Sequence, residues 1–428
     1  MDMNDLILIS VDDHVIEPPN LFDKHLPARY KDIAPRLVTN DKGADTWVYD
    51  GQVIPNFGLN AVVGRPPEEY GMEPTAYSQI RHGTFDVAKR VEDMNADGVL
   101  AAICFPTFPH FAGNRLIASS DKRAALAIIQ AYNDWHIEDW CGAAPGRFIP
   151  LSILPLWDVQ ACVTELKRVA AKGCRTVTFP DNPAAVGLPS IHLGYWDPLW
   201  QAAVEERIVI SSHIGSGNQA PHSSMDSPID AWIVTMPMAI SNAAADWLFS
   251  PVFKKFPDLR LSLAEGGIGW IPYLLERADF VYKHHHAWTN ADFGELLPSE
   301  LFKRNVLTCF IDDQFGLHST DFLNMDMVAW ECDYPHSDCV WPKSPETVWS
   351  AIKHLPKELI DKATHLNAMR EFRFDPFTSL GRENCTVGAL RAQATHVNVT
   401  PVAGMGGHNP SNHSGQPVTS GEVVKMFA

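Results

Sequence analysis

The chain has 428 residues, 46% of them hydrophobic and 13 of them Trp, so it can bury a large core in one barrel domain or in two domains. Its formal net charge of −17 argues against nucleic acid or an anionic membrane as the main partner, because phosphate groups are bound by basic surfaces. Eight cysteines without a Cys-x-x-Cys pair, no signal peptide and no apolar run of about 18 residues favour a cytoplasmic protein with reduced thiols.

The N-terminal part contains one expected strand followed by a long irregular segment. Residues 6–11 form an apolar run that stops at Asp12-Asp13-His14, which predicts a buried strand leading into a polar turn. Residues 21–83 are interrupted by Pro and Gly and show little helical period. Because this segment is too long for an ordinary loop, we expect an insertion that covers a site or a partner.

From there short apolar runs alternate with helical patterns. Further strands are expected at 98–105, 147–154, 173–179, 207–212, 259–264, 305–310 and 327–331. Helices are expected at 85–96, 120–140, 158–171, 195–206, 240–255, 269–282, 344–354 and 357–371. Eight strands, most followed by a crossover helix, predict an α/β (β/α)₈ TIM barrel in residues 1–378.

The last fifty residues differ in composition from the barrel. Beyond residue 380 the chain is rich in Thr, Asn, Gly, Val and Pro and has no helical period. We therefore expect residues 379–428 to be an irregular C-terminal extension that is either disordered or packed on a partner subunit.

Several expected strands end in a carboxylate or a histidine. These residues are Asp12, His14, His213, Glu265 and Asp333. In a barrel the carboxyl ends of the strands meet at one face, so the five side chains would converge. The same turns offer no compensating Lys or Arg, and buried unpaired carboxylates are costly, so a divalent metal ion is the simplest explanation. Taken singly, each residue also fits a structural role such as a core histidine or a helix cap.

His336 lies three residues beyond Asp333 and extends this set. With it the site would hold three carboxylates and three histidines, which is enough for one or two metal ions. A turn histidine bonded to Asp338 is the alternative. A set rich in carboxylates favours Mn or Fe, although Zn remains compatible with it.

The strand-end motifs resemble those of a known family. The chain carries Asp12-Asp13-His14, His213-Ile214-Gly215, Glu265-Gly266-Gly267 and Cys332-Asp333-Tyr334-Pro335. Over residues 6–375 it resembles the amidohydrolase-related family, in the branch that contains aminocarboxymuconate-semialdehyde decarboxylase. The resemblance implies that His14, His213 and Asp333 are metal ligands and that Asp333 also handles protons. Asp12 departs from the usual His or Glu, and Glu265 replaces a histidine that orients metal-bound water.

The resemblance implies three reactions on a small organic substrate, with Asp333, Glu265 and His213 as the catalytic residues. Hydrolysis of a C–N, C–O or C–C bond by metal-activated water is the first expectation, with Glu265 or Asp333 as the base. Non-oxidative decarboxylation is the second, and oxygen-dependent hydroxylation by a dinuclear Fe or Mn centre is the third. A catalytically inactive barrel that serves as a structural subunit is an alternative of another class.

Substrate contacts and partners are less well specified by the sequence. Candidate arginines for a substrate carboxylate are Arg65, Arg81 and Arg175. Aromatic pocket candidates are Phe57, Phe105, Phe108, His110, Phe179 and Trp341. Asp13 should point away from Asp12 and His14 and take a surface or capping role. Because members of the family usually associate, we expect a homo- or hetero-oligomer.

Overall fold

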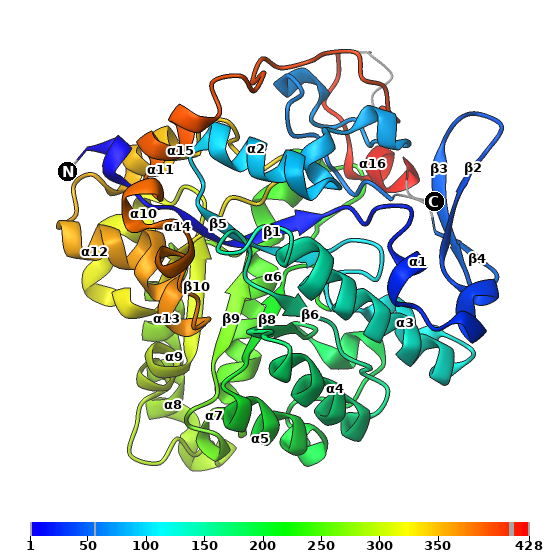
Figure 1. The fold of residues 1–428 in the computed structure, drawn as a ribbon. Coiled ribbons are helices and arrows are strands. Elements are labelled where there is room, and N and C mark those ends of the chain that lie inside the picture. Colours follow the sequence, from blue (N-terminus) through cyan, green and yellow to red (C-terminus); the bar gives the residue numbers. More distant parts are fainter. Residues whose placement is uncertain (1, 55–56, 411–414, 427–428) are drawn as a thin grey trace.

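The computed structural model describes residues 2–54, 57–410 and 415–426. Within them eight parallel strands form one sheet in the order β5-β1-β11-β10-β9-β8-β7-β6. The strands are β1 (Ile9–Val15), β5 (Ala101–Pro106), β6 (Leu151–Ser152), β7 (Thr176–Thr178), β8 (Val209–His213), β9 (Leu261–Ala264), β10 (Val306–Phe310) and β11 (Val328–Trp330). The residues before β6 return to β5, since Ala102 pairs with Phe148 in a parallel bridge. This nearly closed ring confirms the predicted barrel (Figure 1).

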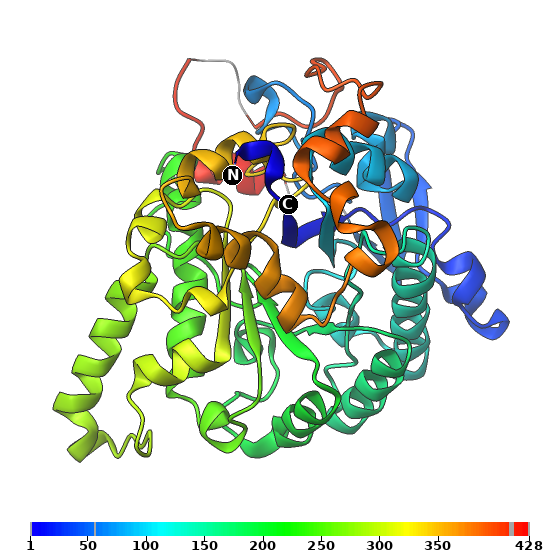
Figure 2. The same cartoon turned by 60° about the vertical axis from the view of Figure 1, so that its left-hand side comes forward.

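Helices surround the ring, as Figure 2 shows. They are α2 (Val87–Asp97), α3 (Lys122–Asp134), α4 (Val159–Ala171), α5 (Asp197–Glu206), α6 (Ile229–Phe249), α7 (Val252–Lys255), α8 (Ile271–Thr289), α9 (Pro298–Asn305), α10 (Gln314–His318), α11 (Ser344–Ile352), α12 (Lys357–Asp361), α13 (Asn367–Glu371) and α14 (Phe377–Leu380). Asp86, Asp121 and Asp158 cap α2, α3 and α4, and each side chain accepts hydrogen bonds from two backbone N–H groups.

Two helices are longer than the sequence pattern predicts. Helix α6 begins at Ile229 rather than near residue 240, and α8 continues to Thr289 rather than ending near 282. The additional residues of α6 include the exposed Ile233 and Val234, so no core-facing stripe marks this part of the helix.

Strand β1 also differs from its prediction. It runs to Val15, so Asp12, Asp13 and His14 belong to the strand and not to a turn after it. Its pairing with β5 shifts register between Ser10 and Asp13, which is the signature of a bulge. Every residue of β1 is buried, because the insertion and the neighbouring strands cover it.

The predicted insertion after the first strand is present. It begins with α1 (Phe22–His25) and continues into a small antiparallel sheet of β2 (Arg36–Thr39), β3 (Asp45–Tyr49) and β4 (Gln52–Ile54). This sheet projects at the right of Figure 1. It is anchored by Trp47, whose ring lies 4.9 Å from that of Phe108 in the barrel loop after β5.

The C-terminal extension contains helices that the sequence pattern does not predict. These are α15 (Val387–Gln393) and α16 (Ser420–Met426). The expectation of no helix beyond residue 380 is therefore corrected. The pattern misses these helices because each has only seven residues, and so short a helix leaves a weak periodic signal in the sequence. The described extension packs on its own chain. The N–H of Val402 is bonded to the carbonyl of Gly64, and the backbones of Glu73 and His408 form an antiparallel β-bridge. A contact with a partner subunit stays a prediction.

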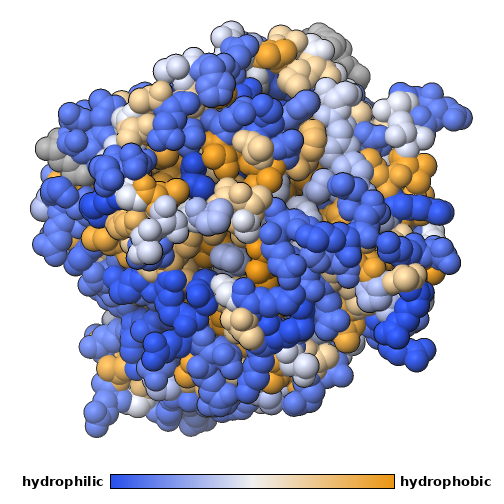
Figure 3. Space-filling view, in the orientation of Figure 1, coloured by the Kyte–Doolittle hydropathy of each residue, from blue (hydrophilic) through white to orange (hydrophobic). Residues whose placement is uncertain are grey.

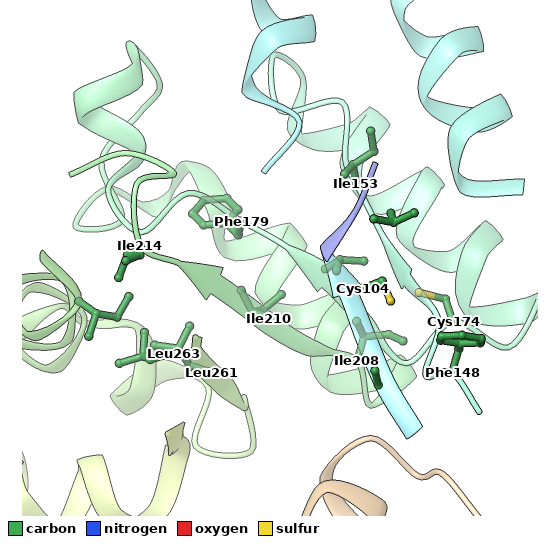
Figure 4. Packing of buried hydrophobic residues seen from close by; sticks show 14 of the residues in the cluster. Cys104, Phe148, Ile153, Cys174, Phe179, Ile208, Ile210, Ile214, Leu261 and Leu263 are labelled. Carbon is green, nitrogen blue, oxygen red and sulfur yellow. The ribbon is translucent and has the colours of Figure 1, made fainter. Parts of the chain in front are cut away.

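The core lies inside the barrel and between the barrel and its helices. Figure 4 shows Ile210, Leu261 and Leu263 of neighbouring strands packed together.

Hydrophilic residues cover much of the face in Figure 3. All eight cysteines are buried free thiols. Within the described ranges, no helix has both the length and the hydropathy needed to cross a lipid bilayer.

Candidate metal centre

Polar side chains meet at the carboxyl end of the barrel strands. They form two overlapping groups, Asp12, His14, His213 and Glu265 in the first and His14, Asp333 and His336 in the second. In each group the candidate ligand atoms lie within 4.8 Å of one another. The structure thus brings together all six residues that the sequence predicts as metal ligands.

His213 is the centre of the first group. Its Nε2 lies 3.0 Å from Oε2 of Glu265, 3.4 Å from Oδ2 of Asp12 and 3.1 Å from Nε2 of His14. Its Nδ1 donates a hydrogen bond of 2.6 Å to the carbonyl of Ile214. That bond leaves the Nε2 lone pair facing the other ligands, which is how metal-binding histidines are usually oriented.

His14 links the first group to the second. Its Nε2 is 3.6 Å from Oδ1 of Asp12 and 3.4 Å from Oδ1 of Asp333. Nδ1 of His336 is 2.9 Å from the same Oδ1 atom of Asp333. The rings of His14 and His336 are in contact, with centroids 3.9 Å apart and their planes tilted by 37°. Oδ1 of Asp333 is therefore in contact with both imidazoles.

The charges at this centre fit a divalent cation. Neither carboxylate oxygen of Asp12 or of Asp333 has a hydrogen-bond partner, and both residues are completely buried. Within the described chain no Lys or Arg forms an ion pair with either residue. Burial raises the pKa of both carboxyls well above the ordinary value, and burial lowers the pKa of His14, which keeps this imidazole neutral. A bound cation offsets the cost of the buried carboxylates.

Two of the carboxylates sit on unusual backbone. Glu265 has a φ of 56° and Asp333 a φ of 58°, in the left-handed region that residues other than Gly rarely adopt. Such a conformation costs about 1–3 kcal/mol and concentrates at functional sites. It turns both side chains from the strand ends toward His213 and His336.

The family follows from a match that covers most of the barrel. Residues 49–374 match the family model described as Amidohydrolase. The chain belongs to the amidohydrolase family. The matched part contains β5 to β11 with His213, Glu265 and Asp333, while Asp12 and His14 precede it.

Individual relatives of this amidohydrolase are decarboxylases. The gamma-resorcylate decarboxylase of Rhizobium sp. (strain MTP-10005) is 26% identical over 273 residues, which are 60% of this chain and 76% of that protein. The 5-carboxyvanillate decarboxylase of Sphingomonas paucimobilis has the same fold, with a TM-score of 0.59, 21% identity and coverage of 86% of this chain and 100% of that one.

A third relative has been solved with a metal ion. It is a dihydroxybenzoic acid decarboxylase from Polaromonas sp. JS666 with bound manganese and the inhibitor 2-nitroresorcinol. Its TM-score is 0.56 at 16% identity, and the match covers 86% of this chain and 96% of that one. At this identity the likeness is one of fold.

Glu331 is a further acid of this amidohydrolase that the sequence analysis does not single out. Its Oε2 accepts a hydrogen bond of 3.0 Å from the backbone N–H of Glu265 and one of 2.6 Å from Sγ of Cys309. Burial raises the pKa of its carboxyl to about 7. Its spacing from Asp333 could have identified it in the sequence, because residues two apart at the end of a strand face the same side of the sheet.

Asp13 points away from the metal centre, as expected, but it is buried and not at the surface. Its Oδ2 lies 3.3 Å from Nη1 of Arg90 on α2, and its Oδ1 accepts a hydrogen bond from Ser10. Arg90 also donates to the carbonyls of His14 and Gly83 and stacks 4.0 Å above the ring of Tyr334. This buried arginine therefore holds the backbone of β1 at His14 and packs against the residue that follows Asp333.

Aromatic rings form one wall of the centre. The ring of Phe111 lies 4.2 Å from that of His213 and 5.0 Å from that of His14, and Phe105 is 5.1 Å from His213. The pocket candidate His110 precedes Phe111 and has a φ of 64°. Burial lowers its pKa to about 4, so its ring is neutral. Phe111 is not among the sequence candidates, although Phe108 and His110 of the same loop are.

One of the proposed substrate contacts, Arg81, lines a separate cavity, and a second, Trp341, packs against Arg81. Arg81 makes two hydrogen bonds to Asp93, and its guanidinium stacks 4.2 Å above the ring of Trp341. Arg81 and Asp93 line a cavity of about 490 Å³ between the insertion, α2 and the C-terminal extension. Because Asp93 already neutralises Arg81, the structure gives no free guanidinium here for a substrate carboxylate.

The remaining candidates are placed elsewhere. Arg65 is buried in the insertion, with Nη2 bonded to the carbonyl of Gln79. Phe179 packs 5.0 Å from both Trp196 and Trp200, between the sheet and α5. Arg175 precedes β7 and so lies at the opposite end of the barrel. None of these three belongs to the clusters at the metal centre.

Proposed function

We propose that this amidohydrolase is a divalent-metal-dependent, non-oxidative decarboxylase of a carboxylated aromatic compound. The observation that carries the proposal is Asp333, a fully buried carboxyl whose oxygens accept no hydrogen bond and whose Oδ1 contacts two histidines of the candidate metal centre. The decarboxylases among the relatives support this reaction over hydrolysis, which is the first expectation from the sequence.

The six converging residues are suited to hold the ion. Mn²⁺ is the ion we propose, since carboxylates and imidazoles suit it and one relative contains manganese. When bound, the cation supplies positive charge for the carboxylate and an adjacent hydroxyl of the substrate.

Asp333 is the residue placed to move the proton. In its protonated form the carboxyl would give its proton to the substrate carbon that bears the carboxylate. The bond from that carbon to the carboxylate then breaks, its electron pair returns to the ring, and CO₂ leaves. A proton from solvent restores Asp333, so the sum is R–COO⁻ plus H⁺ giving R–H plus CO₂.

Other residues position the groups that react. His336 orients Oδ1 of Asp333 from 2.9 Å. Phe105 and Phe111 limit water near the histidines and offer flat apolar faces to an aromatic ring. The Glu265 side chain is 18% exposed and that of His336 is 8% exposed, so solvent and substrate approach from this side.

The test combines metal analysis with CO₂ release. Protein purified without added metal is analysed by mass spectrometry for metal content, then loaded with Mn²⁺ and screened against phenolic carboxylic acids. We expect CO₂ and the decarboxylated product, and a loss of at least about 100-fold in kcat for Asp333→Asn with Mn²⁺ still bound at saturating concentration. Release of an amine or alcohol without CO₂ from amide or ester substrates would replace decarboxylation by hydrolysis.

The second cluster favours one further candidate, oxygen-dependent hydroxylation at a dinuclear centre. His14 belongs to both groups, and Asp333 with His336 gives the second group its own ligands. In this reaction O₂ and two electrons from a reductant convert a C–H bond to C–OH with release of water. Two iron or manganese ions per chain, with oxygen uptake matching hydroxylated product, would establish it; one ion per chain without oxygen uptake would exclude it.

A further inference from the structure

Two cysteines enclose the loop that carries Asp333 and His336. Cys332 directly precedes Asp333, and Cys339 follows His336 by three residues. Their sulfur atoms are in contact, with a distance of 3.5 Å between the two Sγ atoms. Both residues are buried, Cys332 with 2% and Cys339 with 6% of its surface exposed. The contact therefore joins the two ends of the metal-ligand loop.

The surroundings hold the two sulfurs toward each other. Sγ of Cys332 lies 3.6 Å from Oγ of Ser344, which in turn donates a hydrogen bond of 2.6 Å to Asp97. Sγ of Cys339 accepts a hydrogen bond of 3.4 Å from the backbone N–H of Trp341. The N–H of Cys339 also bonds to the carbonyl of His336, which closes a turn inside the loop.

We propose that Cys332 and Cys339 are an oxidation site, at which a hydroperoxide forms a disulfide that locks the metal-ligand loop. The site goes beyond the proposed decarboxylase function and holds for any reaction at this centre. In the first step the sulfur of Cys339, the more exposed of the two residues, attacks hydrogen peroxide, becomes a sulfenic acid and releases water. The sulfur of Cys332 then displaces the hydroxyl as a second water. Two thiols are oxidised and one peroxide is reduced.

The bond needs only a small movement. A disulfide is about 2.05 Å long, so the two Sγ atoms must approach by about 1.5 Å from their present contact. The resulting ring spans residues 332–339 and includes both Asp333 and His336. Because this ring limits how far the loop can open, it should slow the release of metal.

The first experiment asks whether the disulfide forms. The full-length, Mn²⁺-loaded protein is treated with hydrogen peroxide, and in a parallel series with diamide, which oxidises thiols without peroxide chemistry at the metal. We expect the intact mass to fall by two hydrogens, and peptide mapping to join Cys332 to Cys339. Dithiothreitol should reverse the change. Cys339→Ser should abolish the cross-link, while the matched Cys162→Ser on α4 should retain it.

The second experiment measures what the disulfide does. Release of Mn²⁺ to an excess of chelator is followed in the oxidised and reduced proteins, and we expect it to be slowed at least about threefold by oxidation. The Cys339→Ser protein should show no such difference. A missing cross-link, a cross-link between other cysteines, or equal or faster release after oxidation would overturn the proposal. Each of these readouts is independent of decarboxylase activity.

Discussion

The side chain of Glu331 holds the backbone of Glu265. Its Oε2 accepts the Glu265 N–H at 3.0 Å, and so joins the end of β11 to the residue that follows β9. Glu265 has a left-handed backbone, and its own Oε2 lies 3.0 Å from His213. An acid outside both ligand clusters thus fixes the direction of an acid inside one of them.

Replacing Glu331 should therefore weaken metal binding. Glu331→Leu leaves the Glu265 N–H without its acceptor, and we expect about 10- to 100-fold weaker Mn²⁺ binding, the range typical for residues that orient metal ligands. Glu331→Gln keeps an acceptor oxygen and should restore most of the affinity. Titration of the metal-free proteins with Mn²⁺ measures both. Equal affinities for the Leu and Gln variants would contradict a positioning role.

Metal removal should destabilise the fold. Without the cation, Asp12 and Asp333 remain buried with unsatisfied oxygens. A ligand present at about 100 times its Kd stabilises the native state by about 2.7 kcal/mol, so Mn²⁺ should raise Tm by several degrees. Differential scanning calorimetry with and without chelator tests this. Asp12→Ala, which removes a ligand, should lose most of the Mn²⁺-dependent shift; an unchanged shift in that variant would exclude Asp12 as a ligand.

The pair of Arg90 and Asp13 should be important for stability. Both side chains are buried, and Arg90 is also bonded to the carbonyl of His14. Arg90→Met leaves Asp13 as an uncompensated buried charge, which typically costs about 3–5 kcal/mol. Urea unfolding at pH 7 measures the loss. Adding Asp13→Asn to Arg90→Met should recover part of it, and a double variant less stable than Arg90→Met alone would argue against this pairing.

Acid should destabilise the protein partly through His136. This residue of the segment after α3 is fully buried, and its Nε2 donates a hydrogen bond of 3.1 Å to the carbonyl of Cys104. Burial lowers its pKa to about 4 from an ordinary value of 6.5. Between these values the unfolded chain binds the proton and the folded chain does not, so stability falls as pH drops from 6.5 to 4. The contribution of this one group is about 3 kcal/mol at most.

His136→Gln removes that proton-binding site. Its free energy of unfolding, measured in urea at pH 7, 6, 5 and 4, should depend less steeply on pH than that of the unmodified protein. The comparison uses the slope and not the absolute stability, since the substitution also alters packing. A parallel pair of curves would show that His136 does not contribute to acid sensitivity.

The barrel and the polar residues that converge at its mouth could be predicted from the amino-acid pattern. Short apolar runs alternating with helical patterns indicate a parallel barrel, and in a barrel the carboxyl ends of the strands share one face. For this reason Asp12, His213 and Asp333 are expected together although they are far apart in the chain, and the structure places them in two overlapping groups that share His14.

Other features depend on contacts that no local period encodes. The hydrogen bond from Glu265 to Glu331 spans 66 residues and the pair of Asp13 with Arg90 spans 77. The sequence marks Arg81 as a candidate for binding a substrate carboxylate, but in the fold its guanidinium is paired with Asp93 and stacked on Trp341. The sulfur contact of Cys332 and Cys339 likewise depends on the path of the loop between them.

The amino-acid sequence by itself determined the fold class and the residues that gather at the mouth of the barrel, because hydrophobic period and strand ends are local properties. Only the tertiary structure decided which side chains hold those residues in place and which charged candidates are already neutralised. The physical reason is that a buried polar group must find a partner in three dimensions, and the identity of that partner depends on how distant segments pack.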